Sequence, residues 1–219
     1  MSAAARIIAA EADLSDGVAH LLSVEPRFGI ALRDGGPPPL RRRPGGFAAL
    51  FEVIVEQQVS VASGRAIWAR VAAGCAEGGR LTPETVLGRS REELCGLGLS
   101  RPKARYAHEI AAAVAEGRLC FDRLAAASVP EAMAELTAIP GVGRWTAEVY
   151  LMFSEGRPDL FPVGDIALQE AAKALFDLDA RPKEKVFDAL AEPWSPWRAV
   201  AARMLWAYYR HLKGRDGKA

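Results

Sequence analysis

Apolar residues recur along most of this chain at intervals of three and four positions, as in the run from Phe47 to Val55. That interval places side chains on one face of an α-helix, whereas the strict alternation that marks a strand is nearly absent. Further stripes of the same period cover residues 61–71, 106–114 and 197–208. The pattern therefore predicts an all-α protein.

Cap residues and helix breakers mark where these helices should begin and end. Ser60 and Ser100 each precede a helical stripe, so both are predicted to be N-caps. Ser195 followed by Pro196 predicts another start, with the proline in the first helical position. The segments rich in glycine and proline are residues 35–46, 77–83 and 154–164.

The composition indicates a protein with a substantial core and little overall charge. Of its 219 residues, 50% are hydrophobic, and the formal net charge is +1. Such a balance gives no reason by itself to expect a nucleic-acid partner, so any basic surface must be local. No run approaches the roughly 18 apolar residues of a membrane span, and Glu11 and Asp13 come too early for a signal peptide. We therefore expect a cytoplasmic protein with no membrane partner.

The most informative stretch is LTAIPGVGRWTAEVY, residues 136–150, in which Gly141 and Gly143 precede a helical run. Glycine lets a backbone approach a ligand closely, and the N–H groups at a helix start point toward an anion. A dinucleotide-binding loop would need a third glycine where Thr146 stands, and a P-loop would need a Gly-Lys-Ser/Thr sequence. Two interpretations remain: a turn between helices that holds one backbone phosphate of a nucleic acid, or a plain tight turn.

The fuller string resembles the helix-hairpin-helix signature of DNA repair glycosylases, because Leu136, Ile139, Pro140 and Ala147 surround the two glycines. The second mark of that family is an aspartate further along, in a loop that enters a helix, and FPVGDIALQEAAKALF supplies Asp165. The runs FAALFEVIVEQQVSVASGRAIWARV, GLGLSRPKARY and WSPWRAVAARMLWAYY are similar to the AlkA-type branch, the 3-methyladenine DNA glycosylase II group. The resemblance extends over residues 45–212 and points to the short, all-helical members.

This resemblance implies the HhH-GPD glycosylase fold, an all-α fold with two helical subdomains and the active-site cleft between them. We expect a central subdomain at residues 47–160 and a terminal subdomain formed by residues 1–46 and 161–219. The implied partner is double-stranded DNA that contains damaged bases. The protein should bind it as a monomer in the cytoplasm, associated with a nucleoid of bacterial type.

The resemblance also assigns DNA contacts. The backbone N–H groups of Gly141, Val142 and Gly143 would hold a phosphate, with or without a bound monovalent cation. Gln58 matches the wedge that fills the gap left by a flipped base, although it could instead be a polar residue that ends the Phe47 stripe. Further DNA contacts are expected from Ser60, Lys103, Arg144 and Thr146.

Asp165 is the candidate catalytic residue. Loss of a base leaves positive charge on the sugar, and a nearby carboxylate stabilises that charge and helps to orient water. A helix N-terminus favours the ionised carboxylate. On its own, an aspartate before IALQEAAKALF would be read as an ordinary helix cap, and the resemblance is what favours catalysis. Asp159 and Asp177 lack the matching context.

Two tryptophans are candidates for the base pocket. Trp145 stands where bifunctional relatives carry a lysine that forms a Schiff base with the sugar, a reaction that tryptophan cannot perform. Its electron-rich face instead suits a cationic alkylated purine. Trp197 matches another pocket aromatic, but it could equally be a core residue. Larger relatives carry tyrosines where Val149 and Ile166 stand, so the resemblance implies a pocket that selects a narrower or different set of bases.

The resemblance thus implies a monofunctional DNA glycosylase that flips out and hydrolytically removes alkylated purines of the 3-methyladenine and 7-methylguanine type, leaving an abasic site. It implies no cofactor and no metal as a catalytic ligand, and three scattered cysteines do not match the four that an iron–sulfur cluster needs. One alternative is a DNA-binding helix-hairpin-helix protein without turnover. Others are a glycosylase/lyase for other damaged bases and a helical scaffold for proteins.

Overall fold

The computed structural model describes residues 7–216, and over that range the chain is mostly helical. The only β-pairing among these residues is an isolated bridge between Glu77 and Arg80. No helix within the described range is long and apolar enough to cross a membrane. The elements are α1 (Glu11–Val24), α2 (Phe28–Gly35), α3 (Phe47–Glu56), α4 (Val61–Cys75), α5 (Pro83–Leu87), α6 (Arg91–Gly96), α7 (Arg101–Ala115), α8 (Phe121–Ala126), α9 (Val129–Thr137), α10 (Arg144–Tyr150), the π-helix η1 (Leu151–Glu155), α11 (Ile166–Leu175), α12 (Glu184–Ala191), the 3-10 helix η2 (Glu192–Trp194) and α13 (Arg198–Asp216).

The chain divides into two compact units, one formed by Arg43–Tyr150 and the other by the residues before and after it. The second boundary falls at residue 150, before the expected residue 160, because η1 packs with the C-terminal helix although it directly follows α10. Arg203 of α13 donates a hydrogen bond to the Met152 carbonyl at 3.1 Å. The ring centroids of Phe153 and Trp206 lie 5.8 Å apart.

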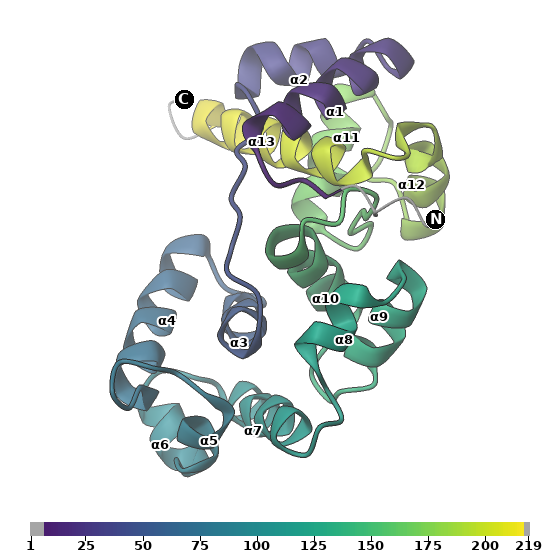
Figure 1. Cartoon of the computed structure of the whole chain (residues 1–219). Helices are drawn as coiled ribbons and strands as arrows, with labels where there is room; N and C mark the ends of the chain where they lie inside the picture. The colour runs from purple at the N-terminus through teal and green to yellow at the C-terminus, as the bar shows by residue number, and fades with distance from the viewer. Residues whose placement is uncertain (1–6, 217–219) are drawn as a thin grey trace. The chain divides into compact units, whose positions relative to one another are not determined.

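Helix α3 forms the core of the unit Arg43–Tyr150. Its apolar stripe is buried, and it packs against α4, α7 and α10, as Figure 1 shows. The start of the helix is fixed to the end of α10, because the Gly46 N–H donates to the Tyr150 hydroxyl at 3.0 Å. This packing brings the segment after α3 and the hairpin before α10 into the same region of one unit.

Helix α13 organises the other unit and contacts α1, α2 and α11 (Figure 1). The approach is close at two glycines. A Cβ atom at Gly17 would lie 2.6 Å from Val200 Cγ2, and one at Gly35 would lie 2.7 Å from the Tyr208 backbone nitrogen. A second cluster surrounds the buried ring of Trp194, and its members are Phe28, Phe161, Phe176 and Phe187.

Two of the three predicted serine caps are confirmed. The Ser60 hydroxyl accepts from the Ser63 N–H, and the Ser100 hydroxyl accepts from the Lys103 N–H. The prediction for Ser195 and Pro196 is wrong, because α13 begins only at Arg198. The Ser195 hydroxyl instead donates to an Asp159 carboxylate oxygen at 2.9 Å. A contact distant in sequence has therefore replaced the local cap.

Candidate nucleic-acid interface and active site

The turn at residues 138–143 joins α9 to α10. A capping box between Ser128 and Glu131 starts α9. The Gly143 carbonyl accepts from the Ala147 N–H at 3.0 Å, so the turn runs directly into α10. None of the hydrogen bonds found among the described residues uses the backbone N–H of Gly141 or Gly143. The Val142 N–H, which was also expected to hold the phosphate, instead donates to the Ile139 carbonyl at 3.0 Å. The N–H groups of Gly141 and Gly143 are available to an anion.

The two glycines of the turn have different surroundings. Gly141 has a φ of +93°, and a Cβ atom there would lie 2.2 Å from Cγ of Tyr106. At Gly143 no atom lies within 4 Å of such a Cβ, and the residue is exposed. Packing and backbone conformation therefore require glycine at position 141. They do not require it at position 143, where close approach of a ligand is the remaining physical reason.

The segment after α3 is bonded to this turn. The Gln57 side-chain amide donates to the Gly141 carbonyl at 3.1 Å and to the Thr146 hydroxyl at 2.8 Å. Thr146 is only 2% exposed, which corrects the expectation that it contacts DNA. Its hydroxyl supports the turn from inside because the amide of Gln57 occupies it.

Gln58, the candidate wedge, is exposed and has a φ of +53°. A non-glycine residue in this left-handed region is uncommon and indicates a constraint on the backbone. The neighbouring Gln57 is turned inward to the hairpin, and Gln58 is directed to the surface. The location suits a wedge, but its insertion into DNA stays a prediction.

Lys103 is half-buried, and its ammonium donates to the carbonyls of Val55 at 2.8 Å and Gln57 at 2.6 Å. Burial lowers the pKa of this ammonium. Both carbonyls lie at the C-terminal end of α3, where carbonyl groups lack partners within the helix. The ammonium is thus engaged inside the protein, and a DNA contact by Lys103 stays a prediction.

The other two expected contacts lie at the surface. Ser60 is exposed, although its hydroxyl caps α4. Arg144 has a side chain that is 55% exposed, and its guanidinium donates to Glu148 at 2.9 Å. Both side chains are open to solvent, Ser60 at the start of α4 and Arg144 at the start of α10.

Asp165 occupies the N-cap position of α11 in the other unit. Its Oδ1 atom accepts from the Leu168 N–H at 3.0 Å and from the Trp206 indole N–H at 3.2 Å. The residue is half-buried. Asp165 is therefore a helix cap, and the carboxylate is also held in one orientation by a side chain from α13. This geometry is compatible with the catalytic interpretation.

Trp206 is the residue that sequence reasoning missed. It is partly exposed and lies beside Phe153, with the two rings inclined by 33°. A signal was present, because Trp206 falls outside the stripe formed by Val200, Met204 and Tyr208. A large aromatic residue away from the buried face of its own helix indicates some other contact.

The two candidate pocket tryptophans have different environments. Trp145 is partly exposed in the first turn of α10. Trp197 is only 4% exposed, and a Cβ atom at Gly17 would lie 3.0 Å from its ring. This burial favours the second interpretation of Trp197, that of a core residue.

Within the described residues, the turn between α9 and α10 and the carboxylate held at the start of α11 are the two marks of the helix-hairpin-helix class of DNA repair proteins. The family model described as "HhH-GPD superfamily base excision DNA repair protein" matches residues 51–196. The chain is a member of that superfamily, as the resemblance implied.

The chain resembles known glycosylases over different lengths. It is 28% identical over 209 residues to the alkylbase DNA glycosidase-like protein mag2 of Schizosaccharomyces pombe, covering 93% of this chain and 98% of mag2. It is 38% identical over 124 residues to the putative DNA-3-methyladenine glycosylase YfjP of Bacillus subtilis, covering 57% of this chain but only 43% of YfjP.

Solved structures agree with this fold. The 3-methyladenine DNA glycosylase Mag1 of S. pombe, in complex with abasic DNA, matches with a TM-score of 0.81 and 26% identity, covering 87% of this chain and 95% of Mag1. The DNA-3-methyladenine glycosidase of Bacillus halodurans matches with a TM-score of 0.76 and 33% identity, covering 90% and 91%.

Proposed function

We propose that the protein is a monofunctional DNA glycosylase of base excision repair that removes alkylated purines of the 3-methyladenine and 7-methylguanine type. The observation that carries the proposal is the carboxylate of Asp165, fixed at the start of α11 by the Leu168 N–H and the Trp206 indole. The names of the relatives, which are alkylbase or 3-methyladenine glycosylases, support the substrate class.

The protein binds duplex DNA as a monomer. The first step is extrusion of the damaged nucleotide from that duplex. Unstacking costs a few kcal/mol and costs least for a damaged base. The N–H groups of Gly141 and Gly143, which none of the hydrogen bonds among the described residues uses, hold the DNA backbone during this step, and Gln58 fills the vacated place in the stack. No cofactor is required for these contacts.

The second step is rupture of the bond between base and sugar. Positive charge develops on the sugar, and the ionised carboxylate of Asp165 stabilises it electrostatically. The bond to the Trp206 indole prevents the carboxylate from turning away. Water then adds to the sugar, and the products are the free base and a strand with an abasic site.

Trp145 supports selection of a cationic purine and the absence of strand cleavage. An indole ring attracts a cation over its face, and alkylation at ring nitrogen gives the purine a positive charge. Tryptophan has no amine, so no Schiff base forms at this position.

Base release from methylated duplex DNA tests the proposed function. We expect free 3-methyladenine or 7-methylguanine by chromatography, and none from an unmethylated duplex. A folded protein that binds an abasic-site duplex but releases no base would favour the alternative, a DNA-binding protein without turnover.

A borohydride assay tests the monofunctional character of the enzyme. We expect no covalent protein–DNA complex, and strands that break only after alkali treatment. Efficient trapping together with breaks before alkali would show a glycosylase/lyase. A bifunctional helix-hairpin-helix glycosylase that has a Schiff-base lysine serves as the positive control.

A further inference from the structure

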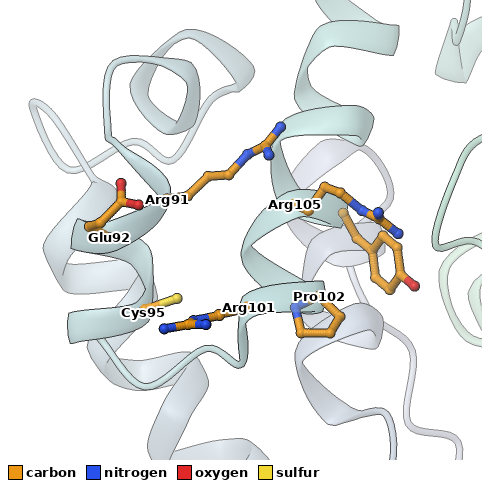
Figure 2. A pocket seen from close by; sticks show the side chains of 7 residues that line it. Arg91, Glu92, Cys95, Arg101, Pro102 and Arg105 are labelled. Atoms are coloured by element: carbon orange, nitrogen blue, oxygen red, sulfur yellow. The ribbon is translucent and has the colours of Figure 1, made fainter.

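A hollow of about 670 Å³ lies between α6 and the first turns of α7. Three of the residues that line it are arginines, Arg91, Arg101 and Arg105, and one is an acid, Glu92. Figure 2 shows Arg91 extending from α6 toward α7, while Arg101 points from α7 back toward Cys95. Arg105 also lines the hollow, and its guanidinium is directed away from α6 (Figure 2). Two helices therefore contribute positive charge to the surface around one hollow.

The arginines of this hollow lack acidic partners, whereas ten other arginines of the described residues form ion pairs. Elsewhere in the same unit, Arg118 pairs with Glu116 at 2.7 Å and Arg123 with Glu135 at 2.6 Å. Within the described part of the chain, none of the three hollow arginines forms an ion pair. The Arg105 guanidinium lies over the Tyr106 ring, 5.1 Å from its centroid. Within the described residues no ion pair neutralises their charge, and Glu92 is the one acid among the residues that line the hollow.

The hollow adjoins the hairpin turn within a single unit. Tyr106 lines the hollow and also lies under Gly141, where it occupies the space of a missing Cβ. One side chain therefore separates the phosphate-holding turn from the arginines. Duplex DNA carries about one charge per 1.7 Å of its axis. A duplex held at the turn therefore places further phosphates near the residues that surround the turn.

We propose that the hollow formed by Arg91, Arg101 and Arg105 is a second DNA-backbone surface that holds phosphates beside the lesion. This inference rests on the proposed function in that the partner is the same duplex. The surface adds affinity without reading sequence, because phosphate contacts position a protein and carry no base information. It also explains how a chain with a formal net charge of only +1 attracts DNA, since the cations are gathered locally.

Salt-dependent binding tests the surface. The probe is a duplex with a tetrahydrofuran abasic analogue, and the variants are Arg91→Ala, Arg101→Ala, Arg105→Ala and their combination. Each lost phosphate contact should reduce the slope of log K against log salt by about one and weaken binding several-fold at low salt. Arg118→Ala is the matched control, because this exposed arginine of the same unit is paired with Glu116.

Thiol protection gives a second readout on the unaltered chain. Cys95 lines the hollow and is partly exposed, and Cys120, also partly exposed, lies outside it. The duplex should slow the alkylation of Cys95 while leaving the rate at Cys120 unchanged. Equal rates at Cys95 with and without saturating duplex would count against the surface.

The possible failures are distinguishable. A triple variant that remains folded by circular dichroism and keeps the wild-type salt slope overturns the surface but leaves the proposed glycosylase intact. If the arginine variants reduce the salt slope as expected but the wild type releases no base, the surface is supported and the proposed enzyme is refuted. A wild-type protein that binds no duplex overturns both.

Discussion

Gly141 and Gly143 stand in one sequence pattern but are needed for different physical reasons. Gly141 is required by its positive φ and by the ring of Tyr106, whereas the open space at Gly143 admits a side chain without a clash. Substitution at Gly143 can therefore alter the ligand site without altering the fold. A test of phosphate binding at the turn should use Gly143.

Gly143→Asp should weaken binding to an abasic-site duplex by about tenfold or more, because a negative charge enters a site for phosphate and opposes charge-assisted hydrogen bonds. Gly143→Ala is the control, since its methyl group meets nothing within 4 Å. It should remain folded and bind more tightly than the aspartate variant. Equal binding by folded Gly143→Asp and wild type would leave the turn with a structural role only.

Asp165→Asn separates catalysis from recognition. Asparagine keeps the shape and can still cap α11, so folding should be preserved. It lacks the charge that opposes the sugar cation, a contribution of roughly 3 kcal/mol or more, which corresponds to about a hundredfold in rate. The loss should be larger for a neutral base such as hypoxanthine than for cationic 3-methyladenine, whose charge already weakens the bond.

Single-turnover excision on both substrates measures this effect, with binding to an uncleavable duplex measured beside it. Unchanged rates would show that another group carries the chemistry. Parallel losses of binding and rate would indicate that Asp165 acts as a structural cap alone, through its bond to Leu168.

Single residues could be placed from sequence only where a motif fixed them. The positions of Gly141, Gly143 and Asp165 followed from the resemblance, but the partners of their neighbours did not. Lys103 and Thr146 have side chains suited to DNA, and both are occupied by groups from the segment around Gln57. Such contacts depend on how α3, α7 and α10 pack, and they cannot be predicted from the local sequence pattern.

At the scale of elements, the end of α3 depends on a helix that is distant in sequence. The ammonium of Lys103, from α7, binds two carbonyls there. We expect Lys103→Met, which keeps most of the apolar stem, to lower the free energy of unfolding by ~1–2 kcal/mol, because these carbonyls lose a charged donor. Urea unfolding measures this loss, and Arg101→Ala provides a control at an exposed position of the same helix.

The same variant discriminates between the two interpretations of Lys103. A phosphate contact would show itself as a reduced salt slope of DNA binding with unchanged stability. The internal role predicts the reverse, a stability loss with a salt slope close to that of the wild type. A stable Lys103→Met variant with a reduced slope would support the expected DNA contact.

Helices were easier to predict than their ends. The three- and four-residue periodicity identified α3, α4, α7 and α13 because burial of one face governs each of them. The start of α13 was misplaced because the Ser195 hydroxyl binds Asp159 instead of capping the helix. The π-helix η1 could not be predicted, because the pattern of apolar residues there is the same as for an ordinary continuation of α10.

At the scale of the whole molecule, each of the two units is a set of helices that share one core. The residues at which the units begin and end could be predicted from the sequence only approximately. Residues 151–155 continue α10 along the chain, yet their side chains pack with α13. Arg203 binds the carbonyl of Met152 and lies over the ring of Phe153, 4.4 Å from its centroid. A sequence pattern that records only periodicity cannot show this change of partner.

The unit that contains α13 is also stabilised by an ion pair that closes the loop before Asp165. Arg198 donates to both carboxylate oxygens of Asp159, at 2.6 and 2.9 Å, and the Ser195 hydroxyl adds a third bond. Burial raises the pKa of Asp159, but the hydrogen bond and charge of Arg198 and the Ser195 bond outweigh burial, so the pKa is lowered. Glu52 and Glu155 behave oppositely, because burial raises the pKa of each.

The sign of the pH dependence follows from these directions. A carboxylate with a lowered pKa adds stability above its unfolded pKa, about 3.9 for aspartate, and loses it as the pH falls through the folded pKa. Asp159→Asn should therefore be less stable than the wild type at pH 7, by ~1–2 kcal/mol for the lost charged hydrogen bonds. The difference should shrink as the pH falls below about 4, the unfolded pKa, and on through the lower pKa of the folded Asp159 carboxylate.

Urea unfolding at a series of pH values from neutral to acid measures that difference. Because the wild type and the variant share Glu52 and Glu155, the opposite pH dependence of these two acids cancels in the comparison. Asp177→Asn is the control, since Asp177 is exposed in the same unit and forms no ion pair among the described residues. A gap between wild type and Asp159→Asn that stays constant across this range would mean that the ion pair contributes nothing beyond the shape of the side chain.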